Sequence, residues 1–205
     1  HVGEVVHRYD GHCRHIDEEK VKTLSAEKDP SLRLSIDSCD IEFTDRWQGV
    51  QHIHLEGELD DYVLRRGDGM YAYNLAVVLD DIAMGITEVI RGDDLLETTG
   101  QQIYLYKTLQ QCLHFKNIKV PSYGHAPLLI DSEGHRLSKR QKSITIRELR
   151  DNQWSANRIL GELAIAGGLV KANTLKNREI SISELIEIDL NLPSLSQKTI
   201  EIKYR

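Results

Sequence analysis

The 205-residue sequence lacks the features of secreted and membrane proteins. Its three cysteines, Cys13, Cys39 and Cys112, are far apart and odd in number, which argues against a disulfide framework and for a reducing compartment. No apolar run approaches the length that a membrane-spanning helix needs, and the first residues, HVGEVVHRYDGH, do not have the layout of a signal peptide. These absences predict a cytoplasmic protein with no membrane partner.

The sequence also lacks the short motifs of several common chemistries. There is no GxxxxGK[ST] phosphate loop and no GxGxxG turn, and the two glycines of RRGDGM fit any hairpin. No CxxC pair, HExxH helix or GxSxG elbow occurs, which removes the commonest zinc, metalloprotease and hydrolase interpretations. The histidines are scattered, and we interpret His52, His54, His114 and His125 as surface or hydrogen-bonded side chains rather than catalytic groups.

Composition predicts a globular protein with a local rather than a general affinity for anions. Apolar residues make up 40% and charged residues 28% of the chain, enough for one or two modest cores. The formal net charge of -6 argues against nonspecific coating of nucleic acid, because that binding depends on cations that neutralise phosphates. Two basic clusters remain candidates for RNA or phosphate contact: Arg65 with Arg66, and the run Arg136 to Lys142.

Pattern along the chain predicts three sections, at residues 1–60, 61–143 and 144–205. Residues 1 to about 30 are polar, lack periodicity and are predicted to be a loop-rich insertion. The alternating stretch SLRLSIDSCDIEFTDRWQGVQHIHLEG that follows predicts antiparallel strands. The last section, with WSANRILGELAIAGGLV and ISISELIEIDL, predicts a small helical domain.

The middle section alternates strand and helix patterns. DDYVLRR predicts a strand, YNLAVVLDDIAM a mostly buried helix, GITEVIRG a strand, and TTGQQIYLYKTLQQCL an amphipathic helix. In the last of these, Thr99 and Gln102 have capping-box spacing, and an apolar face would include Ile103, Tyr106, Leu109 and Leu113. This order favours an α/β fold with a parallel sheet, whose ligands bind at the carboxyl ends of the strands.

A cationic loop follows the next predicted strand, HAPLLI. The turn DSEG leads into HRLSKRQKS, and Thr145 with Glu148 forms a second capping-box pattern directly after it. Loop cations and the unpaired amides of a helix N-terminus attract anions together, so this place is expected to bind phosphate.

Three ordered stretches resemble a known family. They are YDGHCR, then DYVLRRGDGMYAYNLAVVLDDIAMGITEVIRGDDLLETTGQQIYLY, then HAPLLIDSEGHRLSKRQKS. Together they resemble the second half of the catalytic domain of class I glutamyl-tRNA synthetases, most closely the short bacterial glutamyl-Q enzymes. The resemblance implies a Rossmann-type α/β domain with an inserted β-containing region and a small helical C-terminal domain. It also implies an ATP-dependent ligase of glutamate and tRNA.

The cationic loop stands where this family has its Lys-Met-Ser-Lys-Ser loop. By resemblance Lys139 is the catalytic cation, which meets the charge that develops on the phosphates of ATP with its Mg²⁺. Ser138 would shape the loop and help bind ATP. Arg140 and Lys142 would attract the anion at longer range.

The resemblance also implies two glutamate-binding residues, Tyr73 in YAYNL and Arg91 in VIRGDD. A guanidinium can grip a carboxylate through two hydrogen bonds, and a phenol can bond an amine or a carboxylate. Each residue has an ordinary structural alternative. Tyr73 could be a core aromatic of a buried helix, and Arg91 could form an ion pair with Asp93 or Asp94.

A partial zinc motif is implied at YDGHCR. In the family an earlier Cys-x-Cys pair and this stretch together hold zinc, so Tyr9 and Cys13 would be ligands, with His15 as the alternative fourth ligand. The Cys-x-Cys pair does not occur in this chain. Two ligands cannot hold a structural zinc in a closed tetrahedral site, so the complete protein could bind zinc, whereas this chain is expected to bind it weakly or not at all.

The resemblance leaves the acceptor open. The family's His-x-Gly-His signature does not occur in this chain, so we expect about half of a split active site and no glutamate activation by the chain alone. The short section after the loop favours transfer to the queuosine base of tRNA(Asp). Spelling of the loop as RLSKR also fits an ordinary enzyme that charges tRNA(Glu). The third alternative is a noncatalytic module that binds RNA or a protein.

Overall fold

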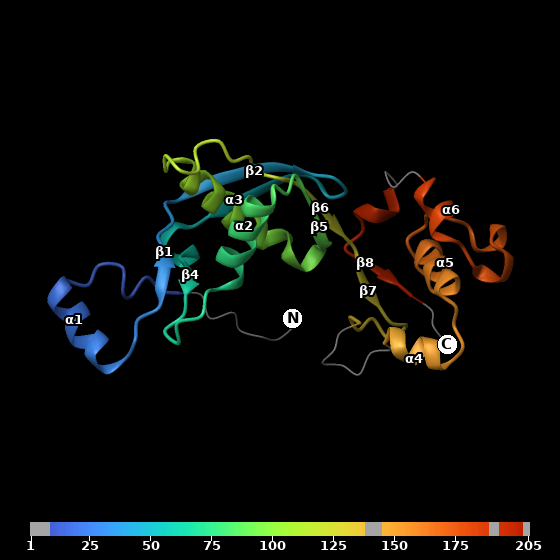
Figure 1. The fold of residues 1–205 in the computed structure, drawn as a ribbon, viewed down its shortest axis with the longest axis horizontal. Coiled ribbons are helices and arrows are strands. Elements are labelled where there is room, and N and C mark those ends of the chain that lie inside the picture. Colours follow the sequence, from blue (N-terminus) through green and yellow to red (C-terminus); the bar gives the residue numbers. More distant parts are fainter. Residues whose placement is uncertain (1–8, 138–144, 189–192, 203–205) are drawn as a thin grey trace. The chain divides into compact units, whose positions relative to one another are not determined.

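The computed structural model describes residues 9–137, 145–188 and 193–202 (Figure 1). The chain divides into two compact units, each described by itself below. Unit 1 comprises His1–Phe43, Val50–Val89 and Glu97–Ser122. Unit 2 comprises Thr44–Gly49, Ile90–Leu96 and Tyr123–Arg205.

Helices and strands alternate through the middle of the chain, as predicted. The helices are α1 Glu18–Glu27, α2 Tyr73–Met84, α3 Leu96–Gln110, α4 Ile146–Asp151, α5 Ala156–Ala166 and α6 Ile182–Ile186. The strands are β1 Leu32–Leu34, β2 Cys39–Asp45, β3 Gly49–Leu55, β4 Tyr62–Arg65, β5 Glu88–Gly92, β6 Ser122–Ala126, β7 Leu128–Ile130 and β8 Thr199–Glu201. Short 3-10 turns are η1 Gly57–Asp60, η2 Asp93–Leu95, η4 Ala172–Thr174, η5 Lys176–Arg178 and η6 Pro193–Ser196.

The largest sheet among the described residues has four strands in the order β3-β2-β6-β5. Strands β2 and β6 are parallel, with Asp45 opposite Tyr123, although they are far apart in the sequence. Strand β1 pairs antiparallel with β4, and β7 pairs parallel with β8. The predicted α/β class is confirmed. No helix in the described ranges is long and apolar enough to cross a bilayer.

Helix α1 lies where the sequence predicted only a loop-rich segment. The Asp17 carboxylate caps it by accepting from the backbone N–H of Lys20, and Glu18 and Glu19 add negative charge to its first turn. None of its residues is buried. A helix with no face packed on a core needs no periodic apolar residues, so its sequence did not show the helical pattern. The prediction of a loop was therefore wrong.

Unit 1 has a core between strands and two helices. Its most buried apolar side chains include Ile36, Ile41, Leu55, Val78 and Tyr106. Helix α3 packs closely on β3, since a Cβ at Gly100 would lie 2.8 Å from Cγ2 of Ile53. The close packing of α3 on β3 therefore requires glycine at position 100.

Three details predicted for the helices of unit 1 are wrong. Helix α3 begins at Leu96, so Thr99 and Gln102 lie inside it, where both are buried and Gln102 donates to Oδ1 of Asn74. They do not form a capping box, and Leu113 lies beyond the helix and is 87% exposed. Helix α2 has the predicted bounds, but Val78 is its only buried residue.

Unit 2 contains the predicted capping box and one unexpected strand. Thr145 accepts from the backbone N–H of Glu148, whose carboxylate accepts from the backbone N–H of Thr145, as predicted. Ser155 caps α5 by accepting from the backbone N–H of Arg158. Section 144–205 was predicted to be helical only, yet β8 within it pairs with β7. A three-residue strand is too short to leave an alternating pattern.

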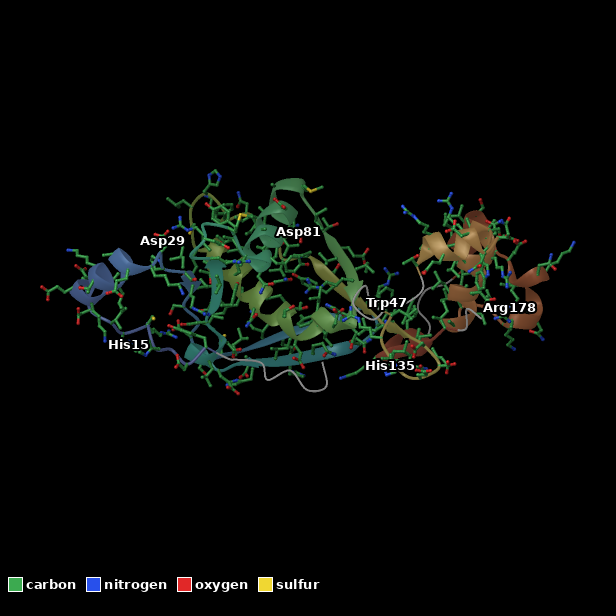
Figure 2. All side chains as sticks on the ribbon, turned by 90° about the horizontal axis from the view of Figure 1, so that it is seen from below. His15, Asp29, Trp47, Asp81, His135 and Arg178 are labelled. Carbon is green, nitrogen blue, oxygen red and sulfur yellow. The ribbon has the colours of Figure 1, made fainter. Side chains whose placement is uncertain are left out.

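Among the glycines in the described part of unit 2, Gly161 lies closest to another backbone segment. A Cβ there would lie 2.0 Å from the carbonyl oxygen of Arg178, which is labelled in Figure 2. The Arg178 guanidinium also pairs with the carboxylate of Glu162, whose side chain is 7% exposed. Any side chain at position 161 would displace η5 and this ion pair.

We therefore expect Gly161→Ala to destabilise unit 2 by about 1–3 kcal/mol, the usual range for overpacking. The measurement is the urea midpoint of the mutant against the parent protein. Asn157→Ala, on an exposed position of the same helix, is the control and should change the midpoint little. Equal midpoints for Gly161→Ala and the parent would show that η5 moves aside without loss.

Candidate active site

Asp45, the last residue of β2, is the centre of a buried polar cluster in unit 2. It is 2% exposed. Its Oδ1 accepts the backbone N–H groups of Trp47 and Gln48, each at 3.0 Å, and of His125 at 3.1 Å. Burial raises the pKa of this carboxyl, but the hydrogen bonds outweigh burial and hold the pKa below its ordinary value. Asp45 is therefore an ionised, fully bonded carboxylate.

His125 lies on β6 beside Asp45 and is 0% exposed. Its Nδ1 is 2.6 Å from Oδ2 of Asp45. Its Nε2 accepts a hydrogen bond from Nε of Arg91 at 3.0 Å. Gln48 donates from its side chain to the backbone carbonyl of His125 at 3.1 Å, which fixes the strand at this point. The interpretation of His125 as a hydrogen-bonded histidine is confirmed.

Arg91, on β5, completes a chain of three buried or half-buried polar side chains. Besides Nε, its Nη2 donates to the backbone carbonyl of Leu95 at 3.3 Å. Its guanidinium carbon lies 5.5 Å from the ring centre of Tyr123, and that ring stacks on His125 at 6.2 Å. Adjacent strands β2, β6 and β5 therefore bring together side chains near their carboxyl ends, the edge where α/β sheets bind ligands.

Two aspartates follow Arg91 in the sequence and differ in their surroundings. Asp94 pairs with Arg136 at 2.9 Å, so this carboxylate contacts the first arginine of the cationic loop. Asp93 Oδ1 is buried and has no hydrogen-bond partner among the described residues. Burial raises the pKa of Asp93, with the charge of Lys198 opposing that change. The position next to Arg91 is thus strongly polar.

Tyr73 is the first residue of α2, in unit 1. Its side chain is 57% exposed, so it is not the core aromatic that the alternative interpretation required. Ala72, before it, provides no side-chain cap. Tyr73 and Arg91 belong to different units, and each is described within its own.

Ser138 and Lys139, together with Arg140 and Lys142, lie outside the described residues. On one side of them, Arg136 forms an isolated antiparallel bridge with Ile130. On the other side, the capped helix α4 begins at Ile146. The predicted phosphate-binding role of the loop stays a prediction.

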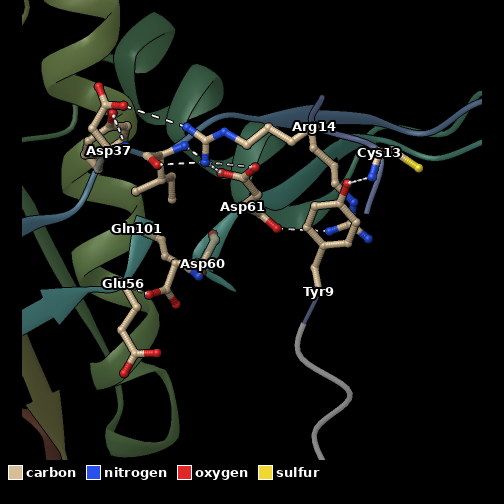
Figure 3. Close-up of polar contacts among 11 residues, drawn as sticks. Tyr9, Cys13, Arg14, Asp37, Glu56, Asp60, Asp61 and Gln101 are labelled. Carbon is tan, nitrogen blue, oxygen red and sulfur yellow. Dashed lines mark hydrogen bonds and ion pairs between the residues drawn. The ribbon is translucent and has the colours of Figure 1, made fainter. Parts of the chain in front are cut away.

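The zinc stretch contains a structural contact rather than converging ligands. The Tyr9 phenol oxygen accepts the backbone N–H of Cys13 at 2.8 Å, while the Cys13 sulfur points away from the ring (Figure 3). Burial raises the pKa of Tyr9, which keeps the phenol protonated. His15 is exposed, and no group of three or more His, Cys, Asp or Glu side chains in the described part of the chain could hold a metal ion. These residues do not fit a zinc site by themselves.

Arg14, in the same stretch, has a role that the sequence did not indicate. Its Nη1 donates to the carbonyl of Ile36 at 3.1 Å and lies 3.3 Å from Oδ1 of Asp61 (Figure 3). Asp61 is 6% exposed and also accepts the backbone N–H of Ile36 at 2.6 Å. The arginine of the motif thus anchors this segment to the core of unit 1.

Comparisons with known proteins agree with this fold and identify the family of the chain. The family model for the catalytic domain of class I tRNA synthetases (E and Q) matches residues 2–200. The glutamyl-Q tRNA(Asp) synthetase of Nitratidesulfovibrio vulgaris is 40% identical over 171 residues, 83% of this chain and 51% of the relative. That of Symbiobacterium thermophilum is 40% identical over 163 residues, 79% of this chain and 48% of the relative.

Among solved structures, the glutamate-tRNA synthetase of Elizabethkingia anophelis has a TM-score of 0.71 at 24% identity. The match covers 96% of this chain and 43% of that one. The fold is thus that of a class I synthetase catalytic domain. The chain belongs to the family of class I glutamyl- and glutaminyl-tRNA synthetases. It spans about half the length of the curated relatives it matches.

Proposed function

We propose that the full-length protein, meaning the complete product of the reading frame that contains this chain, activates glutamate with ATP and transfers it to the queuosine base of tRNA(Asp). The observation that carries this proposal is the group of relatives named glutamyl-Q tRNA(Asp) synthetase, about 40% identical over roughly 80% of the chain. Because the chain spans about half of those relatives, activity is proposed for the full-length protein and not for this chain alone.

Arg91 and Tyr73 are the proposed glutamate-binding residues. Arg91 supports the assignment because its guanidinium is held on one side by His125 and by the Leu95 carbonyl, in a polar cluster at the strand ends. A positioned guanidinium can bind a carboxylate with two parallel hydrogen bonds. Tyr73 supports it because its side chain is largely exposed at the start of a helix, where a phenol can reach a ligand.

Lys139 and Ser138 are the proposed contacts to the ATP phosphates. Attack of the glutamate carboxylate on the α-phosphorus forms a C–O–P bond and releases pyrophosphate, so negative charge grows on the leaving oxygens. A lysine that meets this growing charge stabilises the transition state more than the bound ATP. Mg²⁺, bound with ATP, would share that charge. Zinc has no part in this proposal.

The test is transfer of labelled glutamate by the full-length protein to three substrates: tRNA(Asp) with queuosine, tRNA(Asp) without it, and tRNA(Glu). We expect label on the first alone. A fourth substrate, queuosine-containing tRNA(Asp) without its terminal adenosine, should still accept glutamate, because the acceptor is a base in the anticodon. Since the contacts include phosphates, transfer should fall steeply with salt.

Two other outcomes would refute the proposal. Label on tRNA(Glu) alone would assign the protein to the ordinary glutamyl-tRNA synthetases. No label on any substrate, with intact RNA binding in a filter assay, would favour the noncatalytic binding module.

A further inference from the structure

The buried polar chain Asp45–His125–Arg91 has a fixed direction of hydrogen bonding. Arginine nitrogens only donate, so Nε2 of His125 accepts the bond from Arg91 at 3.0 Å and carries no proton. The proton of the neutral ring is therefore on Nδ1, which donates to Oδ2 of Asp45 at 2.6 Å. The structure thus defines the tautomer of His125 from its two neighbours.

Asp45 is held so that it can impose this tautomer. Its Oδ1 collects three backbone N–H groups, from Trp47, Gln48 and His125, and this leaves Oδ2 directed at the imidazole. An ionised carboxylate only accepts, so Nδ1 must donate. Both side chains are fully buried, and no solvent competes for either bond.

We infer that Asp45 and His125 are positioning residues for Arg91, and that they orient its guanidinium for the carboxylate of the amino acid substrate. This inference rests on the proposed function. Because Nε donates to His125, we expect the substrate carboxylate to bind end-on, at the terminal nitrogens, rather than side-on through Nε. The Leu95 carbonyl fixes the plane of the group through Nη2.

A matched pair of substitutions at position 125 separates positioning from stability. In His125→Asn, the amide nitrogen lies near the former Nδ1 and keeps a donor to Asp45, but Arg91 loses its acceptor. In His125→Gln, the amide oxygen reaches the former Nε2 position and keeps an acceptor for Arg91, but buried Oδ2 of Asp45 loses its donor. The two variants are therefore expected to rank in opposite order for glutamate binding and for stability.

For the full-length protein, we expect His125→Asn to raise the KM for glutamate about tenfold, the size of one lost charge-assisted hydrogen bond. His125→Gln should raise it about threefold or less and lower the melting temperature more than His125→Asn does. The KM for ATP should not change in either. His54→Asn, at an exposed histidine bonded to Asp40 at 2.8 Å, is the control and should leave both constants unchanged.

Asp45→Asn tests the tautomer directly. The amide oxygen can still accept the three backbone N–H groups, but the amide N–H₂ now donates to Nδ1 and moves the ring proton to Nε2, opposite the Arg91 donor. We expect Asp45→Asn to raise the KM for glutamate about tenfold in the parent background. In the His125→Gln background the rise should be less than about twofold, because that variant has no imidazole whose tautomer can change.

A spectroscopic measurement independent of activity completes the experiment. Nitrogen-15 NMR of the histidine-labelled full-length protein should show His125, assigned by its loss in His125→Gln, protonated on Nδ1, and on Nε2 in Asp45→Asn. Protonation on Nε2 in the parent protein, or equal effects of Asn and Gln at position 125 on the KM for glutamate, would overturn the inference.

Arg91→Ala separates the two proposals. An unchanged KM for glutamate in this variant refutes the proposed role of Arg91, and with it the inference. A raised KM in Arg91→Ala with no effect in Asp45→Asn or His125→Asn refutes the positioning alone.

Discussion

Lys139→Ala in the full-length protein is expected to lower the rate of glutamate activation on the order of 10²-fold, the usual cost of one lost electrostatic contact to a transition state. The KM for glutamate should change little, because the lysine is proposed to meet charge that appears only as pyrophosphate leaves. Lys139 lies outside the described residues, and the argument rests on its place in RLSKR, between the Arg136 bridge and the capped start of α4. The measurement is ATP–pyrophosphate exchange with saturating glutamate and acceptor tRNA.

A charge-matched control distinguishes chemistry from general attraction of anions. Lys142→Ala removes the same charge from the same loop, and we expect a much smaller loss, visible mainly in the KM for ATP and reduced by salt. Unchanged exchange in Lys139→Ala would remove this residue from the mechanism. Equal losses in both variants would show that the loop acts only through its summed charge.

Local sequence patterns predicted where helices and strands lie better than they predicted where a helix begins and which of its side chains are buried. Thr145 with Glu148 and Thr99 with Gln102 have identical spacing, and only the first pair caps a helix. The second pair lies inside α3 because the turn η2 starts the helical run earlier, and both side chains are then buried. A four-residue pattern contains no information about where the preceding segment enters the helix.

Only part of the site could be predicted, because one of its residues lies in a local motif and the others meet only in the folded chain. Arg91 was identified from its motif, yet its partners Asp45 and His125 were not, since they are 80 positions apart and meet only through the parallel pairing of β2 with β6. The nearest signal was a pair of strand-end polar residues, Asp45 before a turn and His125 before a proline-containing segment. Such signals are common in sequences and become specific only when the strand order is known.

The contacts of Arg91 determine what its replacement by lysine would remove. The alternative to a glutamate-binding role was an ion pair with Asp93 or Asp94, and Asp94 pairs with Arg136 at 2.9 Å. Arg91 donates to His125 and to the Leu95 carbonyl. These two hydrogen bonds leave one guanidinium in fixed directions. A lysine ammonium cannot make both, because it has neither the planar fork nor a second nitrogen.

Arg91→Lys in the full-length protein is therefore expected to raise the dissociation constant for glutamate by about tenfold or more while the protein stays folded. Charge is conserved, so a purely long-range attraction of the substrate would survive the change. Calorimetric titration with glutamate is the measurement, with circular dichroism to follow folding. Arg158→Lys, at an arginine that stacks on Trp154 at 3.9 Å, is the control for the same substitution elsewhere in unit 2 and should leave glutamate affinity unchanged. Equal glutamate affinity in Arg91→Lys and the parent protein would return Arg91 to a structural role, because a carboxylate bound by the guanidinium would lose one of its two hydrogen bonds to a lysine ammonium.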